Sequence, residues 1–250
     1  MLDPVTILLA TGRLGGMAFT APVLSNPAVG RSVRVLISAA LAVGFMWGRG
    51  GVVEASSFID LATLTGVEFA IGAAMGLMTR LMFVGVELAA EQASVQMGIS
   101  LGQVYSGGPD SAGPIGSLFG MVAILVFIAI GGLNDLVWAL GESLNMLPVG
   151  AWLDGSEQHV LSMIVAGLSG AFVLALKIAG GVLAAMLLTS AALGVAQRMI
   201  PQAHILSTGL PARALVGLGA CAGALKAMGW AIEEYWTPLG SLLATLWKGV

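Results

Sequence analysis

Residues 160–195 read VLSMIVAGLSGAFVLALKIAGGVLAAMLLTSAALGV and carry one charged side chain, Lys177. A helix needs about 20 apolar residues to cross the hydrocarbon core of a bilayer. This stretch is long enough for a kinked helix or a helical hairpin, and the pair Gly180 and Gly181 interrupts it. It therefore predicts helical membrane spans, not the core of a soluble domain.

The rest of the chain has the same character. Hydrophobic residues make up 58% of its 250 residues and charged residues 9%, and the mean hydropathy is +0.97. Soluble domains carry about 25% charged residues. So much apolar surface must face lipid or partner subunits. We predict one all-α, polytopic membrane domain over residues 1–250.

The sequence contains about six apolar helical stretches, which we separate by their length and by the glycine and proline residues between them. They cover residues 5–24, 33–47, 61–91, 115–140, 160–195 and 205–228. The longest polar, glycine-rich segment is 92–114, and residues 229–250 form a C-terminal tail. The basic loop with Arg31 and Arg34 favours a cytoplasmic position by the positive-inside rule.

Several charged side chains lie in or beside the apolar stretches, where each costs at least about 2.5–3.5 kcal/mol on insertion scales. We single out the following set as intramembrane charges or subunit contacts: Arg13, Glu68, Arg80, Glu87, Glu91, Lys177 and Arg198. One interpretation is that they snorkel or form structural pairs. The other is that they face a water-filled path or another subunit. A row of charge along one helix face argues in either case that this face does not touch lipid.

Catalytic and metal-binding patterns are missing from the sequence. Cys221 is the single cysteine, and His159 and His204 lie far apart without carboxylate–histidine spacing. These counts predict no disulfide, no zinc or di-iron site and no cofactor. There is no phosphate-binding loop and no basic run for nucleic acid. We expect no enzyme activity.

An ordered set of short motifs carries a resemblance to a known family. The set comprises APV at 21–23, QMGIS at 96–100, SLNMLPVG at 143–150, ALGVAQRMIPQ at 192–202 and GLP at 209–211. In this order and spacing, over about residues 5–228, the chain resembles the flagellar biosynthesis protein FliR family, which is shared with the type III secretion export apparatus. The resemblance implies helical hairpins that pack into a hetero-oligomeric export gate.

The resemblance also implies partners and a place in the cell. The expected partners are FliP-like and FliQ-like membrane subunits, an FlhB-like subunit, membrane lipid and unfolded flagellar axial proteins in transit. The expected location is the bacterial cytoplasmic membrane, as a multi-pass protein of the flagellar basal body. The family's subunit catalyses no reaction.

In the family, the loop after the QMG motif helps to plug the closed pore. Carried onto this chain, the apolar plug residues are Met97, Ile99, Leu101, Val104 and Tyr105. The family's plug often has aromatic residues where Leu101 and Val104 stand here. Glycines would let the loop bend away when cargo arrives, and the expected hinge positions are Gly98, Gly102, Gly107 and Gly108.

Three other functions stay open at this point. A small-solute or proton-coupled transporter would use Arg80, Glu87 and Lys177 as sites, although the sequence shows no inverted repeat. An injectisome-type export subunit would have the same fold. A structural subunit of an unrelated membrane complex is the third possibility.

Overall fold

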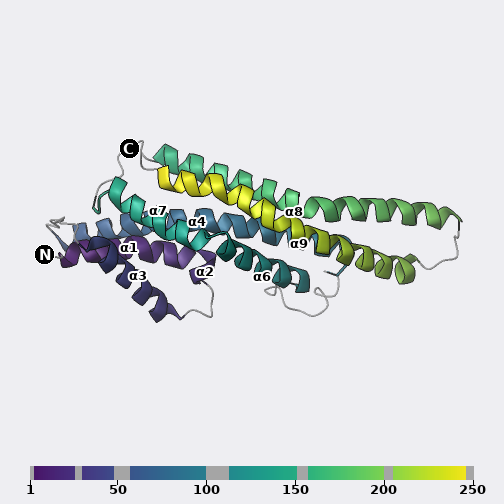
Figure 1. Ribbon diagram of the computed structural model, residues 1–250, viewed down its shortest axis with the longest axis horizontal. Coiled ribbons are helices and arrows are strands. Elements are labelled where there is room, and N and C mark those ends of the chain that lie inside the picture. Colours follow the sequence, from purple (N-terminus) through teal and green to yellow (C-terminus); the bar gives the residue numbers. More distant parts are fainter. Residues whose placement is uncertain are drawn as a thin grey trace. The chain divides into compact units, whose positions relative to one another are not determined.

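The computed structural model describes residues 3–25, 30–47, 57–99, 113–150, 157–199 and 205–245. These residues are almost entirely helical (Figure 1). The helices are α1 (Pro4–Thr20), α2 (Pro22–Ser25), α3 (Arg31–Met46), α4 (Phe58–Met97), α6 (Pro114–Ala129), α7 (Gly132–Met146), α8 (Glu157–Met199) and α9 (Ile205–Thr245). The all-α fold predicted from the sequence is confirmed.

Proline and glycine set several helix ends. Pro22 follows Ala21, whose backbone is extended, and it starts α2 after α1 has ended; a proline has no N–H with which to continue α1. Pro114 stands in the first turn of α6, where its missing N–H costs nothing. Gly131 has a positive φ of 83° and separates α6 from α7. The apolar stretch 115–140 is therefore two helices.

Fewer helices than six are suited to cross a membrane. Within the described residues, three are long and apolar enough, namely α4, residues 164–196 of α8 and residues 209–238 of α9, and α6 with α7 adds a fourth if the broken pair counts as one span. The 17 residues of α1 and 16 of α3 reach only about 25 Å, short of a hydrocarbon core of about 30 Å. The prediction of about six stretches counted these two short helices.

Other boundaries differ from the sequence-based ones. The polar segment 92–114 begins inside α4, which continues to Met97. The stretch 160–195 forms part of a single helix, α8, and not a hairpin. α9 continues through the tail to Thr245. Polar and glycine residues do not end these helices because tertiary packing overrides weak local propensity.

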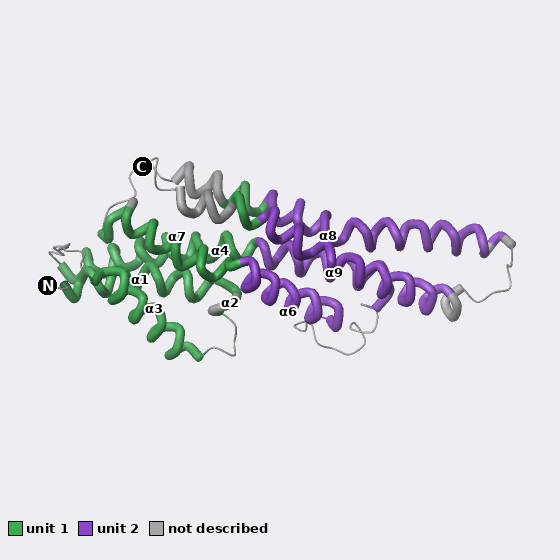
Figure 2. Tube along the Cα trace, in the orientation of Figure 1, with its two compact units in different colours: residues 1–81, 131–168, 236–250 green, residues 82–130, 169–235 purple. Residues whose placement is uncertain are grey.

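The helices divide into two compact units, which Figure 2 colours separately. Unit 1 comprises residues 1–81, 131–168 and 236–250, and unit 2 comprises residues 82–130 and 169–235. The long helices α4, α8 and α9 each contribute to both units. The prediction of a single domain stays a prediction, because contact density within one chain does not test it.

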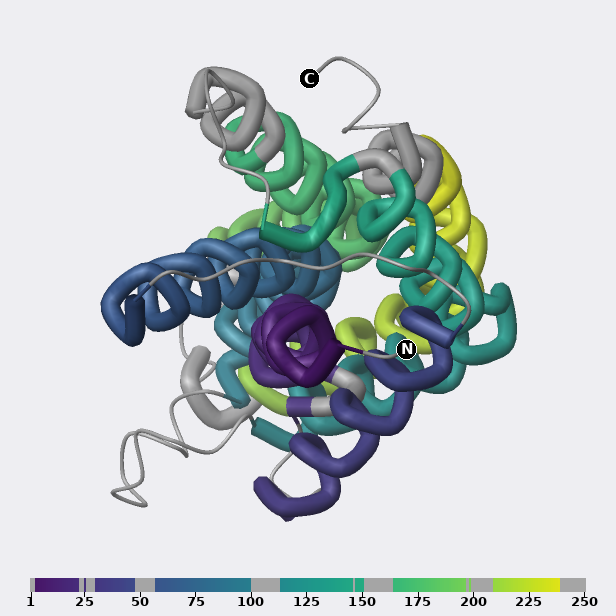
Figure 3. Tube along the Cα trace, turned by 90° about the vertical axis from the view of Figure 1, so that its left-hand side faces the viewer, coloured from purple at the N-terminus to yellow at the C-terminus, as the bar shows by residue number. Residues whose placement is uncertain are grey.

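In unit 1, α1 lies among α3, α4 and α7 (Figure 3). Close approach between α1 and α4 depends on glycine. A Cβ at Gly72 would overlap the carbonyl oxygen of Arg13, and a Cβ at Gly16 would overlap that of Phe69. Small residues let helix backbones approach this closely. The sequence treated the many glycines as compositional only, and the structure shows that these two are required.

In unit 2, the C-terminal part of α4 packs against α6 and α8. Phe83 and Phe127 meet edge to face, with 5.6 Å between ring centroids. A Cβ at Gly85 would lie 2.7 Å from the carbonyl oxygen of Ala171, so α4 and α8 are close there. The buried apolar side chains of this part of α4 are Met82, Phe83, Val86, Ala89, Ala90, Ala93 and Met97.

Candidate functional site

Two of the predicted intramembrane charges form a buried ion pair in unit 1. Arg13 comes from α1 and Glu68 from α4, and their side chains are 0% and 1% exposed. Nε of Arg13 donates to Oε2 of Glu68 at 2.5 Å. Desolvating both charges is expensive, and the pair is tolerable only with good geometry and further hydrogen bonds. Spacing along the chain could not have matched these residues, which are 55 positions apart.

The further hydrogen bonds come from α7 and the turn that follows it. Nη1 of Arg13 donates to the carbonyl oxygen and hydroxyl of Ser143, each at 3.0 Å, and to the carbonyl oxygen of Leu147 at 3.1 Å. The N–H of Gly150 donates to Oε1 of Glu68 at 2.9 Å. We call this arrangement the Arg13 cluster. It joins α1, α4, α7 and the turn at 147–150.

Sequence reasoning missed Ser143, Leu147 and Gly150 as partners of these charges. All three lie in the SLNMLPVG motif, which carried family resemblance but no assigned role. Three of the four accepting or donating groups are backbone atoms, so side-chain type gave little signal. One nitrogen, Nη2 of Arg13, is buried with no hydrogen-bonding partner within the described residues.

The other charges predicted along α4, unlike Glu68, lie on the protein surface. Arg80, Glu87 and Glu91 are all exposed, and no ion pair or hydrogen bond within the described residues includes their side chains. Glu87 and Glu91 are four residues apart on one helix face, where like charges repel. Within the described residues, therefore, no opposite charge neutralises this surface.

Lys177 has a partner, which lies in unit 2. Its Nζ is 2.7 Å from Oε2 of Glu234 and 5.2 Å from the centre of the Trp230 ring. The lysine and glutamate side chains are 38% and 45% exposed, so the pair lies on the surface of α8 and α9. Glu234 and Trp230 both fall in the predicted tail, and the sequence assigned neither of them a charged partner, although their spacing of four is the signal that could have joined them. Arg198 is exposed in the last turn of α8.

The end of α4 holds the described part of the predicted plug. Met97 is only 1% exposed and Ile99 is partly exposed. Gly98 has a positive φ of 77°. The remaining predicted plug and hinge residues lie outside the described residues: Leu101, Gly102, Val104, Tyr105, Gly107 and Gly108. The plug and hinge roles stay predictions.

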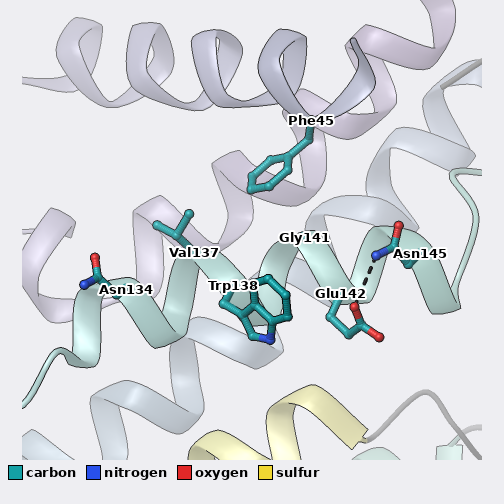
Figure 4. Close-up of a pocket in the computed structure, with 7 residues that line it drawn as sticks. All are labelled: Phe45, Asn134, Val137, Trp138, Gly141, Glu142 and Asn145. Atoms are coloured by element: carbon teal, nitrogen blue, oxygen red, sulfur yellow. Dashed lines mark hydrogen bonds between the residues drawn. The ribbon is translucent and has the colours of Figure 1, made fainter. Parts of the chain in front are cut away.

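A cavity of about 310 Å³ lies in unit 1 beside Phe45 of α3 and the outer face of α7 (Figure 4). Trp138 and Val137 make its wall largely apolar, and Asn145 donates to Glu142 at 3.1 Å on its polar side. Such a lining suits an apolar side chain better than a charged ligand. No group of three or more His, Cys, Asp or Glu side chains that could hold a metal occurs within the described ranges.

Together these features define a multi-spanning helical membrane protein in which the described residues form a buried ion-pair cluster and leave further charges on helix surfaces. The chain matches the family model of bacterial export proteins, family 1, over residues 5–239. It belongs to that family.

Curated relatives are consistent with this membership. The chain is 25% identical over 217 residues to the flagellar biosynthetic protein FliR of Aquifex aeolicus, covering 86% of this chain and 83% of that protein. It is 27% identical over 239 residues to FliR of Escherichia coli, covering 94% and 89%. FliR of Bacillus subtilis is 24% identical over 151 residues, covering 60% and 58%.

The family, the relatives and the apolar helices agree with one another. The chain is a multi-pass subunit of flagellar protein export in the bacterial inner membrane. This confirms the family, the location and the leading function predicted from the sequence. Nothing in these findings favours the solute transporter, and the three relatives are all flagellar rather than injectisome proteins.

Proposed function

We propose that the chain helps to form and to close the pore through which unfolded flagellar axial proteins leave the cytoplasm. In this proposal it works without catalysis, in the flagellar basal body. Its partners are FliP-like and FliQ-like membrane subunits and an FlhB-like subunit. Membership of the export family supports this assignment.

The observation that carries the proposal is the unpaired charge on α4. Glu87 and Glu91 are exposed on a helix apolar enough to span a membrane. At the centre of a lipid-facing span, a charged side chain costs about 2.5–3.5 kcal/mol on insertion scales. A partner protein or a water-filled path removes that cost. A gate subunit has both, whereas a self-sufficient helical bundle would pair such charges internally.

Closure in this proposal depends on the segment from Met97 to Gly113. A pore for unfolded chains must stay shut to ions when no cargo is present. Apolar side chains shut a narrow passage by contact and by dewetting, and Leu101, Val104 and Tyr105 supply them here. Methionine adapts its shape to irregular neighbours, which suits Met97 at the base of the segment.

Deletion of Gly102 to Gly113 tests the closing role. We expect membranes of cells with this variant to leak small ions while flagellar export continues, because the segment that closes the pore is lost and the pore itself remains. Potassium loss and secreted flagellin measure the two effects. A control that keeps the loop length, with Leu101, Val104 and Tyr105 changed to serine, should leak as well. Tight membranes in both variants, at normal protein levels, would contradict the role.

A further inference from the structure

The side chain of Met97 occupies a site in unit 2 that only glycine leaves open. A Cβ at Gly217 of α9 would overlap Cγ and Sδ of Met97, and it would lie 3.3 Å from Cε of Met186 of α8. Met97 and Met186 are both buried. The last residue of α4 is therefore buried against α9, at a point where α9 has no side chain.

The chain leaves α4 at this same point with a fixed direction. The N–H of Gly98 donates to the carbonyl oxygen of Val95 at 3.0 Å, and the N–H of Ile99 donates to that of Ser94 at 3.1 Å. This pair of bonds with a positive φ at glycine is the Schellman ending of a helix. A Cβ at Gly98 would also lie 2.6 Å from Cδ2 of Leu210 on α9.

The preceding turns of α4 are held as firmly. Ala89, Ala90 and Ala93 are buried, and Gly85 brings the backbone of α4 close to that of Ala171 on α8. Close packing of small residues leaves little room for α4 to shift along its neighbours. In unit 2, α8 and α9 thus hold the end of α4 in place.

We propose that Gly217 is a positioning residue for pore closure. It makes the space that receives Met97, and so it fixes the point and the direction in which the chain leaves α4. We call the packing of Met97 against Gly217 the Met97 anchor. The inference rests on the proposed function, because it gives α9 control over the segment that closes the pore. In the same proposal, Gly98 ends α4 and fixes the point at which the chain leaves this helix.

Other glycines on α9 show that this space is specific. A Cβ at Gly219 or at Gly223 would meet no atom within 4 Å. Both are exposed. Glycine at these two positions is therefore not required by packing within the described chain, whereas Gly217 faces Met97. This difference supplies a matched control on the same helix.

The test compares Gly217→Leu with Gly219→Leu in the assembled export complex. We expect Gly217→Leu to displace Met97 and raise potassium loss to the level of the 102–113 deletion, at wild-type amounts in the membrane. Membranes with Gly219→Leu should retain potassium as the wild type does. Membranes with the milder Gly217→Ala variant should also lose potassium. The double variant with Met97→Ala should lose less potassium than either single variant, because the smaller side chain at 97 leaves room for the Cβ at 217. If Gly217 served only the stability of the fold, the effect of Gly217→Ala on potassium loss would not depend on the side chain at position 97.

A cross-link tests the contact itself, whatever the leak shows. Met97→Cys with Gly217→Cys, in a Cys221→Ala background, brings two thiols within the usual disulfide reach of about 3.5–4.5 Å between Cβ atoms. We expect oxidation to protect both thiols from maleimide labelling while flagellin export continues, because the anchor stays closed during transport. Failure to form the cross-link, or a block of export that reductant reverses, would overturn the proposal.

The two proposals fail in different ways. If the 102–113 deletion leaks but Gly217→Leu is tight at normal levels, the positioning role of Gly217 is wrong and the closing role stands. If the deletion itself is tight, the closing role is wrong, and the positioning role falls with it even when the cross-link forms.

Discussion

At the scale of the residue, the Arg13 cluster shows how a charge is kept inside an apolar chain. Arg13 is fully enclosed, yet its Nε and Nη1 make four hydrogen bonds to Glu68, Ser143 and Leu147. The energetics of such a pair are asymmetric. Replacing both partners by apolar groups is often neutral, whereas removing one leaves an uncompensated buried charge.

This asymmetry gives a direct prediction. Glu68→Gln keeps the shape of the side chain and removes its charge, and we expect it to destabilise the protein by about 3–5 kcal/mol because Arg13 stays charged and buried. Thermal unfolding in detergent and the amount of protein in the membrane measure the loss. The double variant Arg13→Met with Glu68→Leu is the control and should recover much of the stability. Equal losses in the single and double variants would contradict this account.

At the scale of the element, the packing of α1 on α4 is decided by backbone contact at glycine. Gly72 faces the carbonyl oxygen of Arg13, and backbone atoms cannot move aside as a flexible side chain can. Gly66, on the same helix, meets nothing within 4 Å. The same residue type therefore has opposite consequences for stability at two positions six residues apart.

We therefore expect Gly72→Ala to cost about 1–3 kcal/mol or more through overpacking. Gly66→Ala should be neutral or stabilising by up to about 1 kcal/mol, because alanine is the better helix former. The melting temperature of the purified protein measures both. Equal effects of the two substitutions would show that the closeness of α1 and α4 does not depend on Gly72.

At the scale of the whole molecule, much of the surface has no partner within the described chain. Large apolar side chains are exposed on α3, α6, α8 and α9, and Val35, Leu36, Leu125 and Leu187 are examples. The charges on α4 and the Lys177–Glu234 pair lie on the same kinds of helix surface. Apolar and charged groups side by side suit subunit contacts better than lipid alone.

This surface predicts the state of the purified protein. We expect the tagged chain to copurify from mild detergent with two other small hydrophobic proteins, identified by mass spectrometry as FliP-like and FliQ-like. Glu87→Lys with Glu91→Lys should lower the recovery of at least one of them if these carboxylates meet a basic partner. Stable purification of the chain alone, as a monomer or homodimer, would contradict the proposed assembly.

The sequence by itself determined the helical membrane class and the family. These follow from hydropathy and from ordered local motifs, which are properties of neighbouring residues. It also located Arg13, Glu68 and Met97 as residues of interest. Of the six apolar stretches that it predicted, the two that form α1 and α3 give helices too short to cross a bilayer.

The tertiary structure alone decided which charges are paired and which glycines are required. Arg13 meets Glu68 and Ser143 across 55 and 130 positions of sequence, and Met97 meets Gly217 across a similar range. Such contacts depend on how helices far apart in the chain pack. The charge of Glu68 looks no different from that of Glu87 in the sequence, and only burial beside Arg13 makes one structural while the other stays on the surface.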